Sequence, residues 1–168
     1  AGLALKETLK KKKVSAHLVM TNHSDMIKAR NVIATQKGTD LPNEEIVVGG
    51  HLDSWDLATG AIDNGIGSFS VLDMARAFKA NKLAPRRTVK FVMFMGEEQG
   101  LLGSRAYVKQ HFGEMKGAGN QFGPRDPNAP KPELVKGADY EKFSSYFNLD
   151  NGTGKIRGVY LQGNEAVR

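Results

Sequence analysis

The spacing of apolar residues along the chain predicts both strands and helices. Runs rich in β-branched and other apolar residues predict strands at 14–21, 29–35, 45–50, 88–95, 143–149 and 156–161. A broad apolar band at helical spacing predicts a helix over 65–80, and 104–111 is typical of a shorter helix. The run 88–95 is nearly unbroken in apolar residues, as in a central strand covered on both faces. Strands separated by helices predict an α/β fold, with a mixed, largely parallel sheet sandwiched between helices.

Two segments fall outside this pattern. Residues 1–13 are typical of the tail of a charged helix whose beginning is missing, and residue 1 is not an initiator Met. Residues 113–137 contain four of the six prolines, which predicts a long loop or lid. The length of 168 residues is that of one domain with a real core.

Composition narrows the possible chemistry. The chain has no Cys, which excludes disulfides, a cysteine nucleophile and a thiolate metal site, so any metal must be held by His and carboxylates. No apolar stretch is long enough for a membrane span. Much of the net charge of +6 lies in Lys10–Lys13. No aromatic residues interleave with this run, so a solvated helix end is favoured over a nucleic-acid contact.

Three of the predicted strands each run into a potential metal ligand or acid. The first ends at His51, the second at the pair Glu97 and Glu98, and the third at Asp150. If these strands are parallel, all four side chains meet at the carboxyl edge of the sheet, where ligands bind in open α/β folds. Asp63, at the head of the following helix, joins them there. Each acid alone is more often a surface charge, but their joint placement favours a site.

These residue types fit one chemistry. Imidazole and carboxylates without thiolates suit a catalytic zinc, and one carboxylate can bridge two metal ions. Of the neighbours Glu97 and Glu98, one can bind metal while the other moves protons. Asp53, two residues after His51, is placed to fix the imidazole tautomer. Trp55 is interpreted as a packing residue rather than a substrate platform.

Four motifs together resemble the co-catalytic zinc exopeptidase family, which includes bacterial leucyl aminopeptidases and plasma glutamate carboxypeptidase. They are Gly-His-Leu-Asp-Ser at 50–54, Gly-Ala-Ile-Asp-Asn-Gly-Ile-Gly at 60–67, Gly-Glu-Glu-Gln-Gly-Leu-Leu-Gly-Ser at 96–104 and Asn-Leu-Asp at 148–150. The carboxypeptidase branch is the more similar, through His-Leu-Asp-Ser-Trp at 51–55. The resemblance implies the phosphorylase/hydrolase-like fold of zinc exopeptidases.

The resemblance also implies a role for each site residue. His51 and Asp150 would bind the first zinc, Asp63 would bridge both ions, and Glu98 would bind the second. Glu97 would be the general base and acid, with Asp53 beside it in the catalytic set. The peptide bond between Asp63 and Asn64 is expected to be cis. The substrate would be a peptide, with either its amino or its carboxyl end recognised.

One departure from the family pattern concerns the second zinc, which takes a further His from later in the chain. No His follows His111 here, so we expect a fragment of a longer enzyme, with little or no turnover by itself. It would consist of a charged helix remnant at 1–13 and a C-terminally truncated catalytic domain at 14–168. A secreted or periplasmic location is expected from the resemblance. The alternatives are a receptor-type binding domain of the same fold and a single-zinc acyltransferase of the glutaminyl cyclase type.

Overall fold

A four-stranded sheet forms the centre of the protein in the computed structural model, which describes residues 2–13, 15, 17–117, 128, 131–150, 152–161 and 164. The strand order is β1-β3-β2-β6. Strands β3 and β6 run parallel to β2, whereas β1 is antiparallel to β3. The strands are β1 (Val32–Gln36), β2 (Leu41–His51), β3 (Arg87–Phe94) and β6 (Phe143–Asn148).

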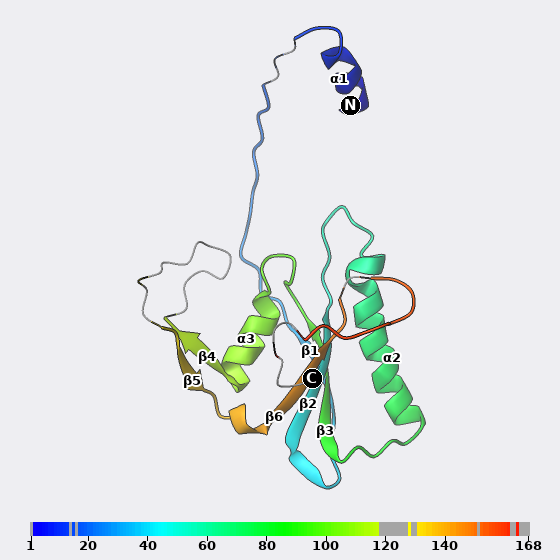
Figure 1. Ribbon diagram of the computed structural model, residues 1–168, viewed down its shortest axis with the longest axis vertical. Helices are drawn as coiled ribbons and strands as arrows, with labels where there is room; N and C mark the ends of the chain where they lie inside the picture. Colours follow the sequence, from blue (N-terminus) through cyan, green and yellow to red (C-terminus); the bar gives the residue numbers. More distant parts are fainter. Residues whose placement is uncertain are drawn as a thin grey trace.

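Apolar side chains of β3 alternate between the two faces of the sheet and are buried on both. Val89 and Phe91 pack against the helix α2 (Ile66–Ala80) through Val71, with Phe78 edge-on to Phe91. On the opposite face, Val92 packs with residues of α3 (Leu102–His111). The sheet is therefore covered by one helix on each side, as Figure 1 shows. The predicted sandwich of helices around a mixed, largely parallel sheet is confirmed.

The turns at the helix starts direct the chain back over the rim of the sheet. Before α2 lies η1 (Ala61–Gly65), in which the peptide bond between Asp63 and Asn64 is cis, as the family resemblance implied. Before α3 lies the turn 96–101, where Gly96 has φ 76° and Leu101 has φ 62°. Gly96 meets the first of these left-handed conformations without steric cost. Both turns lie beside the carboxyl ends of the strands.

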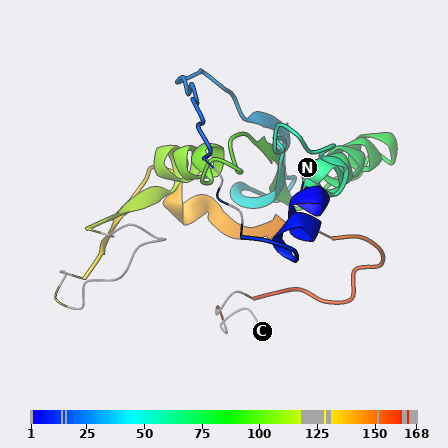
Figure 2. The ribbon, with the colours of Figure 1, turned by 90° about the horizontal axis from the view of Figure 1, so that it is seen from above.

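The remaining elements lie at the periphery. The strands β4 (Gly113–Lys116) and β5 (Glu133–Lys136) form a two-stranded antiparallel sheet, and η2 (Tyr140–Lys142) leads into β6. The helix α1 (Gly2–Leu9) lies apart from the sheet at the end of an extended stretch, as Figure 1 shows. In the view from above, α2 and α3 lie on opposite sides of the sheet (Figure 2). None of the described helices has the length and apolar character to cross a membrane.

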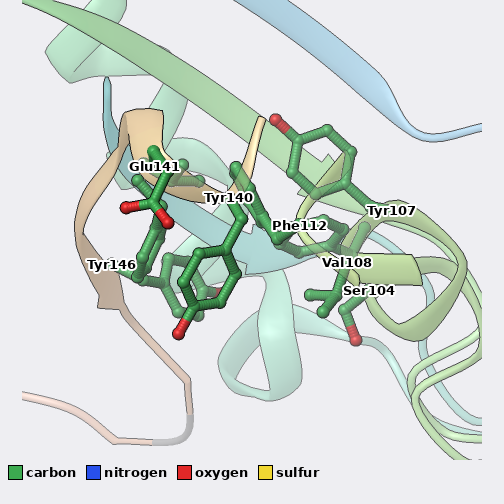
Figure 3. Close-up of a pocket in the computed structure, with 10 residues that line it drawn as sticks. Ser104, Tyr107, Val108, Phe112, Tyr140, Glu141 and Tyr146 are labelled. Atoms are coloured by element: carbon green, nitrogen blue, oxygen red, sulfur yellow. The ribbon is translucent and has the colours of Figure 1, made fainter. Parts of the chain in front are cut away.

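An aromatic cavity of about 430 Å³ lies on the α3 face of the sheet. Figure 3 shows Ser104, Tyr107 and Val108 of α3 along one side and residues of η2 and β6 along the other. Rings meet edge-on across it, such as Phe94 with Tyr107 at 5.7 Å between centroids. This cavity has none of the predicted site residues in its lining.

Two predicted strands are wrong, because the described residues within 14–21 and all of 156–161 form no strand. A strand needs a hydrogen-bonding partner as well as a suitable composition, and these two segments have none in the described structure. The strand predicted at 29–35 is present as β1, which begins at Val32 rather than at residue 29. The predicted loop 113–137 contains β4 and β5, although 118–127 and 129–130 lie outside the described residues.

Candidate metal centre

The carboxyl ends of β2, β3 and β6 bring the predicted residues to one rim of the sheet. His51 is the last residue of β2 and is in register with Phe94, three residues before Glu97. Gly49 is in register with Asn148, two residues before Asp150. The hydroxyl of Ser68, in the first turn of α2, donates to the His51 carbonyl oxygen at 2.6 Å. The parallel pairing therefore produces the cluster that the sequence predicted.

His51, Asp63 and Asp150 form the tightest group at this rim. The His51 Nε2 atom lies 3.0 Å from Asp63 Oδ1 and 3.2 Å from Asp150 Oδ1. One donor atom from each of the three residues lies within 4.8 Å of the others. Donors that share one zinc at about 2.0–2.2 Å are about 3.3–3.6 Å apart in a tetrahedral arrangement. The observed separations of 3.0 and 3.2 Å lie just below this range, so the three residues are close enough to share one ion.

A second group consists of His51, Glu97 and Glu98, again with donor atoms within 4.8 Å of one another. Glu98 Oε1 is buried and has no hydrogen-bond partner among the described residues. Burial raises the pKa of Glu98, and the neighbouring charges of Asp63 and Glu97 raise it further. A buried carboxylate oxygen without a donor is costly unless a cation compensates it. The donor set therefore fits a metal ion on this side too.

The orientation of His51 is set by the main chain of Asp53. His51 Nδ1 lies 3.0 Å from the carbonyl oxygen of Asp53, so Nδ1 carries the proton and Nε2 faces Asp63 and Asp150. The carboxylate of Asp53 is farther from Nδ1, at 3.7 Å. Burial lowers the pKa of His51, but the carboxylates of Asp150 and Glu97 outweigh this and raise it. The side chain of Asp53 is thus not the main partner of the imidazole, which differs from the sequence interpretation.

The Asp53 carboxylate instead holds the main chain of the glutamate pair. Its Oδ1 accepts a hydrogen bond from the Glu97 amide at 3.0 Å, and its Oδ2 accepts one from the Glu98 amide at 3.1 Å. Two bonds from one carboxylate fix the position of both glutamates relative to β2. Short spacing along the chain could not reveal this contact, because residues 53 and 97 meet only through the parallel pairing of β2 with β3.

Two further side chains near the rim differ from what the sequence suggested. Trp55 is 60% exposed, so its interpretation as a packing residue is wrong. Asn64 is 2% exposed and joins the start of α2 to the end of β6: its Oδ1 accepts a hydrogen bond from the Gly67 amide, and its Nδ2 donates one to the Leu149 carbonyl oxygen. A small polar residue within a metal-binding motif carries no sequence signal for a contact with a distant strand.

Comparison with known proteins finds peptidases. Carboxypeptidase Q from Rattus norvegicus is 30% identical over 138 residues, covering 82% of this chain and 24% of the relative. A probable leucine aminopeptidase 2 from Aspergillus fumigatus is 36% identical over 107 residues, covering 64% of this chain and 21% of the relative. A solved Peptidase M28 precursor from Shewanella amazonensis SB2B is 44% identical, with a TM-score of 0.45 over 47% of this chain and 18% of that chain.

The chain therefore spans about a quarter or less of the length of these relatives. A family model described as Peptidase family M28 matches residues 31–162, which include every residue of the rim cluster. This match covers well over half of the 168 residues. The chain belongs to Peptidase family M28.

Proposed function

We propose that the protein is a zinc-dependent exopeptidase, which removes terminal residues from peptides by hydrolysis. The observation that carries this proposal is the convergence of one imidazole and four carboxylates at a single rim, with Glu98 Oε1 buried and lacking a donor. Membership of Peptidase family M28 supports the hydrolytic reaction. The relatives include proteins named carboxypeptidase and aminopeptidase, so the proposal leaves open which end of the peptide is recognised.

In this proposal His51 and Asp150 hold a first zinc ion, Glu98 holds a second, and Asp63 bridges the two. The close contacts of His51 Nε2 with Asp63 and Asp150 support the first set. The buried Glu98 Oε1, which has no donor among the described residues, supports the second set.

Bound zinc supplies a Lewis acid that polarises a peptide carbonyl and makes water a better nucleophile at neutral pH. Glu97 accepts the proton of the attacking water and delivers it to the leaving amine, the role of a general base and then acid. Asp53 keeps the Glu97 main chain in place through the bond to its amide, at 3.0 Å. The main-chain carbonyl of Asp53 keeps His51 in the tautomer whose Nε2 is free to bind.

Metal analysis of the full-length protein, together with assays on peptides blocked at one end, tests this proposal. We expect up to two zinc ions per chain, and hydrolysis that is lost on chelation and restored by Zn²⁺. A protein that binds no zinc and cleaves neither peptide would instead fit a receptor-type domain. One ion per chain with cyclisation of amino-terminal glutamine would fit the acyltransferase alternative.

A further inference from the structure

Asn64 is the one polar side chain among the largest fully buried residues of the described structure, with 2% of its surface exposed. Its amide Nδ2 donates a hydrogen bond to the carbonyl oxygen of Leu149 at 3.0 Å. Its Oδ1 accepts one from the main-chain amide of Gly67 at 3.1 Å. Both polar groups of the side chain are therefore used within the protein, and neither faces the rim cluster.

The segments that meet at this amide are those that carry the candidate metal ligands. Asn64 itself follows Asp63, and Leu149 precedes Asp150. The Leu149 amide also donates to Gly49 of β2 at 3.0 Å, so the end of β6 is held on its other side by the strand that ends in His51. The Asn64 amide thus joins the main chain beside Asp63 to that beside Asp150, and the Leu149 amide joins the latter to the strand that ends in His51.

Two glycines make room for the amide. A Cβ at Gly67 would overlap both Asn64 and the Leu149 carbonyl oxygen. A Cβ at Gly50 would lie 3.0 Å from the Leu149 oxygen and 3.3 Å from Asn64 Nδ2. The end of β2, the start of α2 and the end of β6 approach this closely only because neither position has a side chain.

We propose that Asn64 is a positioning residue, whose amide sets the separation of His51, Asp63 and Asp150 and thereby the affinity for metal. The inference rests on the proposed function, because it assigns those three residues to a metal ion. Groups that orient metal ligands without touching the ion typically change affinity about 10–100-fold when they are removed. A purely structural amide would change the free energy of unfolding and leave the affinity unchanged.

The first test compares two buried side chains that make the same kinds of bond. Asn64→Leu removes one donated and one accepted hydrogen bond at the rim. Thr88→Val removes the bond donated to the Pro42 oxygen, at 2.8 Å, and the one accepted from Gly38, at 3.1 Å. Thr88 lies near the opposite end of the sheet and is 4% exposed. Zn²⁺ affinity is measured on the full-length protein by competition with a chromophoric chelator, beside urea unfolding.

We expect Asn64→Leu to lower the Zn²⁺ affinity about 10–100-fold and Thr88→Val to leave it unchanged, while both lower the stability. Equal affinities of the wild type and Asn64→Leu, or equal losses in the two variants, would overturn the positioning role. A wild-type protein that binds no Zn²⁺ would refute the proposed function itself, which is a different result.

The second test remains informative if Asn64→Leu does not fold. Gly50→Ala crowds the Asn64 amide and the Leu149 oxygen, whereas Gly49→Ala, one residue earlier, crowds Phe94 and Tyr146 at 3.0 and 3.1 Å. The two changes introduce the same methyl group with similar crowding on opposite faces of β2. We expect only Gly50→Ala to weaken Zn²⁺ binding and to alter the visible spectrum of the Co²⁺-substituted protein. Identical affinities and spectra for both variants would contradict the proposal.

Discussion

Charged side chains gather in two regions of this protein, and the two regions balance their charges differently. At the rim, Asp63 and Asp150 contact His51, and no Lys or Arg among the described residues forms an ion pair with them. On the α3 face, the buried or half-buried acids Glu45 and Asp139 each have a cationic partner. Glu45 Oε2 lies 2.7 Å from Lys90 Nζ, and Asp139 Oδ1 lies 2.7 Å from Lys142 Nζ.

The difference separates charges that are paired within the chain from charges that, in the proposed function, bind a metal ion. Burial lowers the pKa of Lys90, yet its contact with Glu45 at 2.7 Å outweighs this and raises the pKa, so the ammonium group of Lys90 stays protonated. At the rim, burial and the neighbouring carboxylates of Asp63 and Glu97 raise the pKa of Glu98 instead, and the imidazole of His51 offsets this only in part. Several acids converging on one imidazole are therefore better evidence of a ligand site than any single acid.

The largest expected effect is that of Glu97→Gln on turnover. The amide keeps the size of the side chain but cannot accept a proton, so we expect kcat to fall about 10²–10⁴-fold with zinc content unchanged. Steady-state assays and metal analysis of the full-length protein measure both quantities. Glu133→Gln, in exposed β5, is the matched control and should leave kcat unchanged. Unchanged turnover in Glu97→Gln would remove Glu97 from its proposed role.

Asp63→Ala tests whether the carboxylates at the rim bind a metal ion. Because Asp63 is proposed to bridge both ions, its loss should weaken Zn²⁺ binding at both sites by more than about 100-fold. That value is the upper end of the loss expected for a residue that orients a ligand without touching the ion. Equilibrium dialysis of the variant gives the occupancy of each site. Asp73→Ala removes an exposed acid of α2 that pairs with Arg76, and it should retain zinc like the wild type. Full zinc retention in Asp63→Ala would refute the bridge.

Substitutions on the α3 face should lower the stability of the protein and leave its metal binding unchanged. Lys90→Met leaves Glu45 buried without a cation, since the two side chains are only 15% and 11% exposed. We expect the free energy of unfolding to fall by about 3 kcal/mol, measured by urea denaturation, with Zn²⁺ affinity unchanged. The double variant Lys90→Met with Glu45→Leu removes both charges and should recover most of this loss. A double variant as unstable as the single one would contradict the charge argument.

Much of the rim could be predicted because its residues follow apolar runs directly. The strands ending near His51, Glu97 and Asp150 were recognisable from their composition, and parallel pairing then required their ends to meet. The antiparallel direction of β1 and the absence of a strand at 156–161 were not predictable in this way. Both depend on which hydrogen-bonding edge is available, and no local pattern encodes that.

Contacts between residues distant in sequence were missed for a related reason. Lys90 interrupts an apolar strand, and only the fold reveals that Glu45 of β2 lies beside it. The bonds of Asp53 to the glutamate amides likewise join residues more than forty positions apart. Composition identifies which side chains can bind a metal, whereas the side chains that position them are recognised only from geometry.

The smallest expected effect concerns Asp139, which contacts His111 at the end of α3. Hydrogen bonds from Lys142 and His111 lower the pKa of Asp139 from 3.8 to about 2. Because the folded protein binds this proton less readily than the unfolded chain, the resulting stability is complete above pH 3.8 and is lost as the pH falls through about 2. Urea denaturation should show Asp139→Asn less stable by about 1 kcal/mol at pH 6, a modest value because solvent screens the half-buried pair. The difference from the wild type should vanish near pH 2, and Lys142→Met should show the same trend. Parallel stability profiles for the wild type and Asp139→Asn between pH 2 and 5 would mean that this ion pair does not stabilise the α3 face.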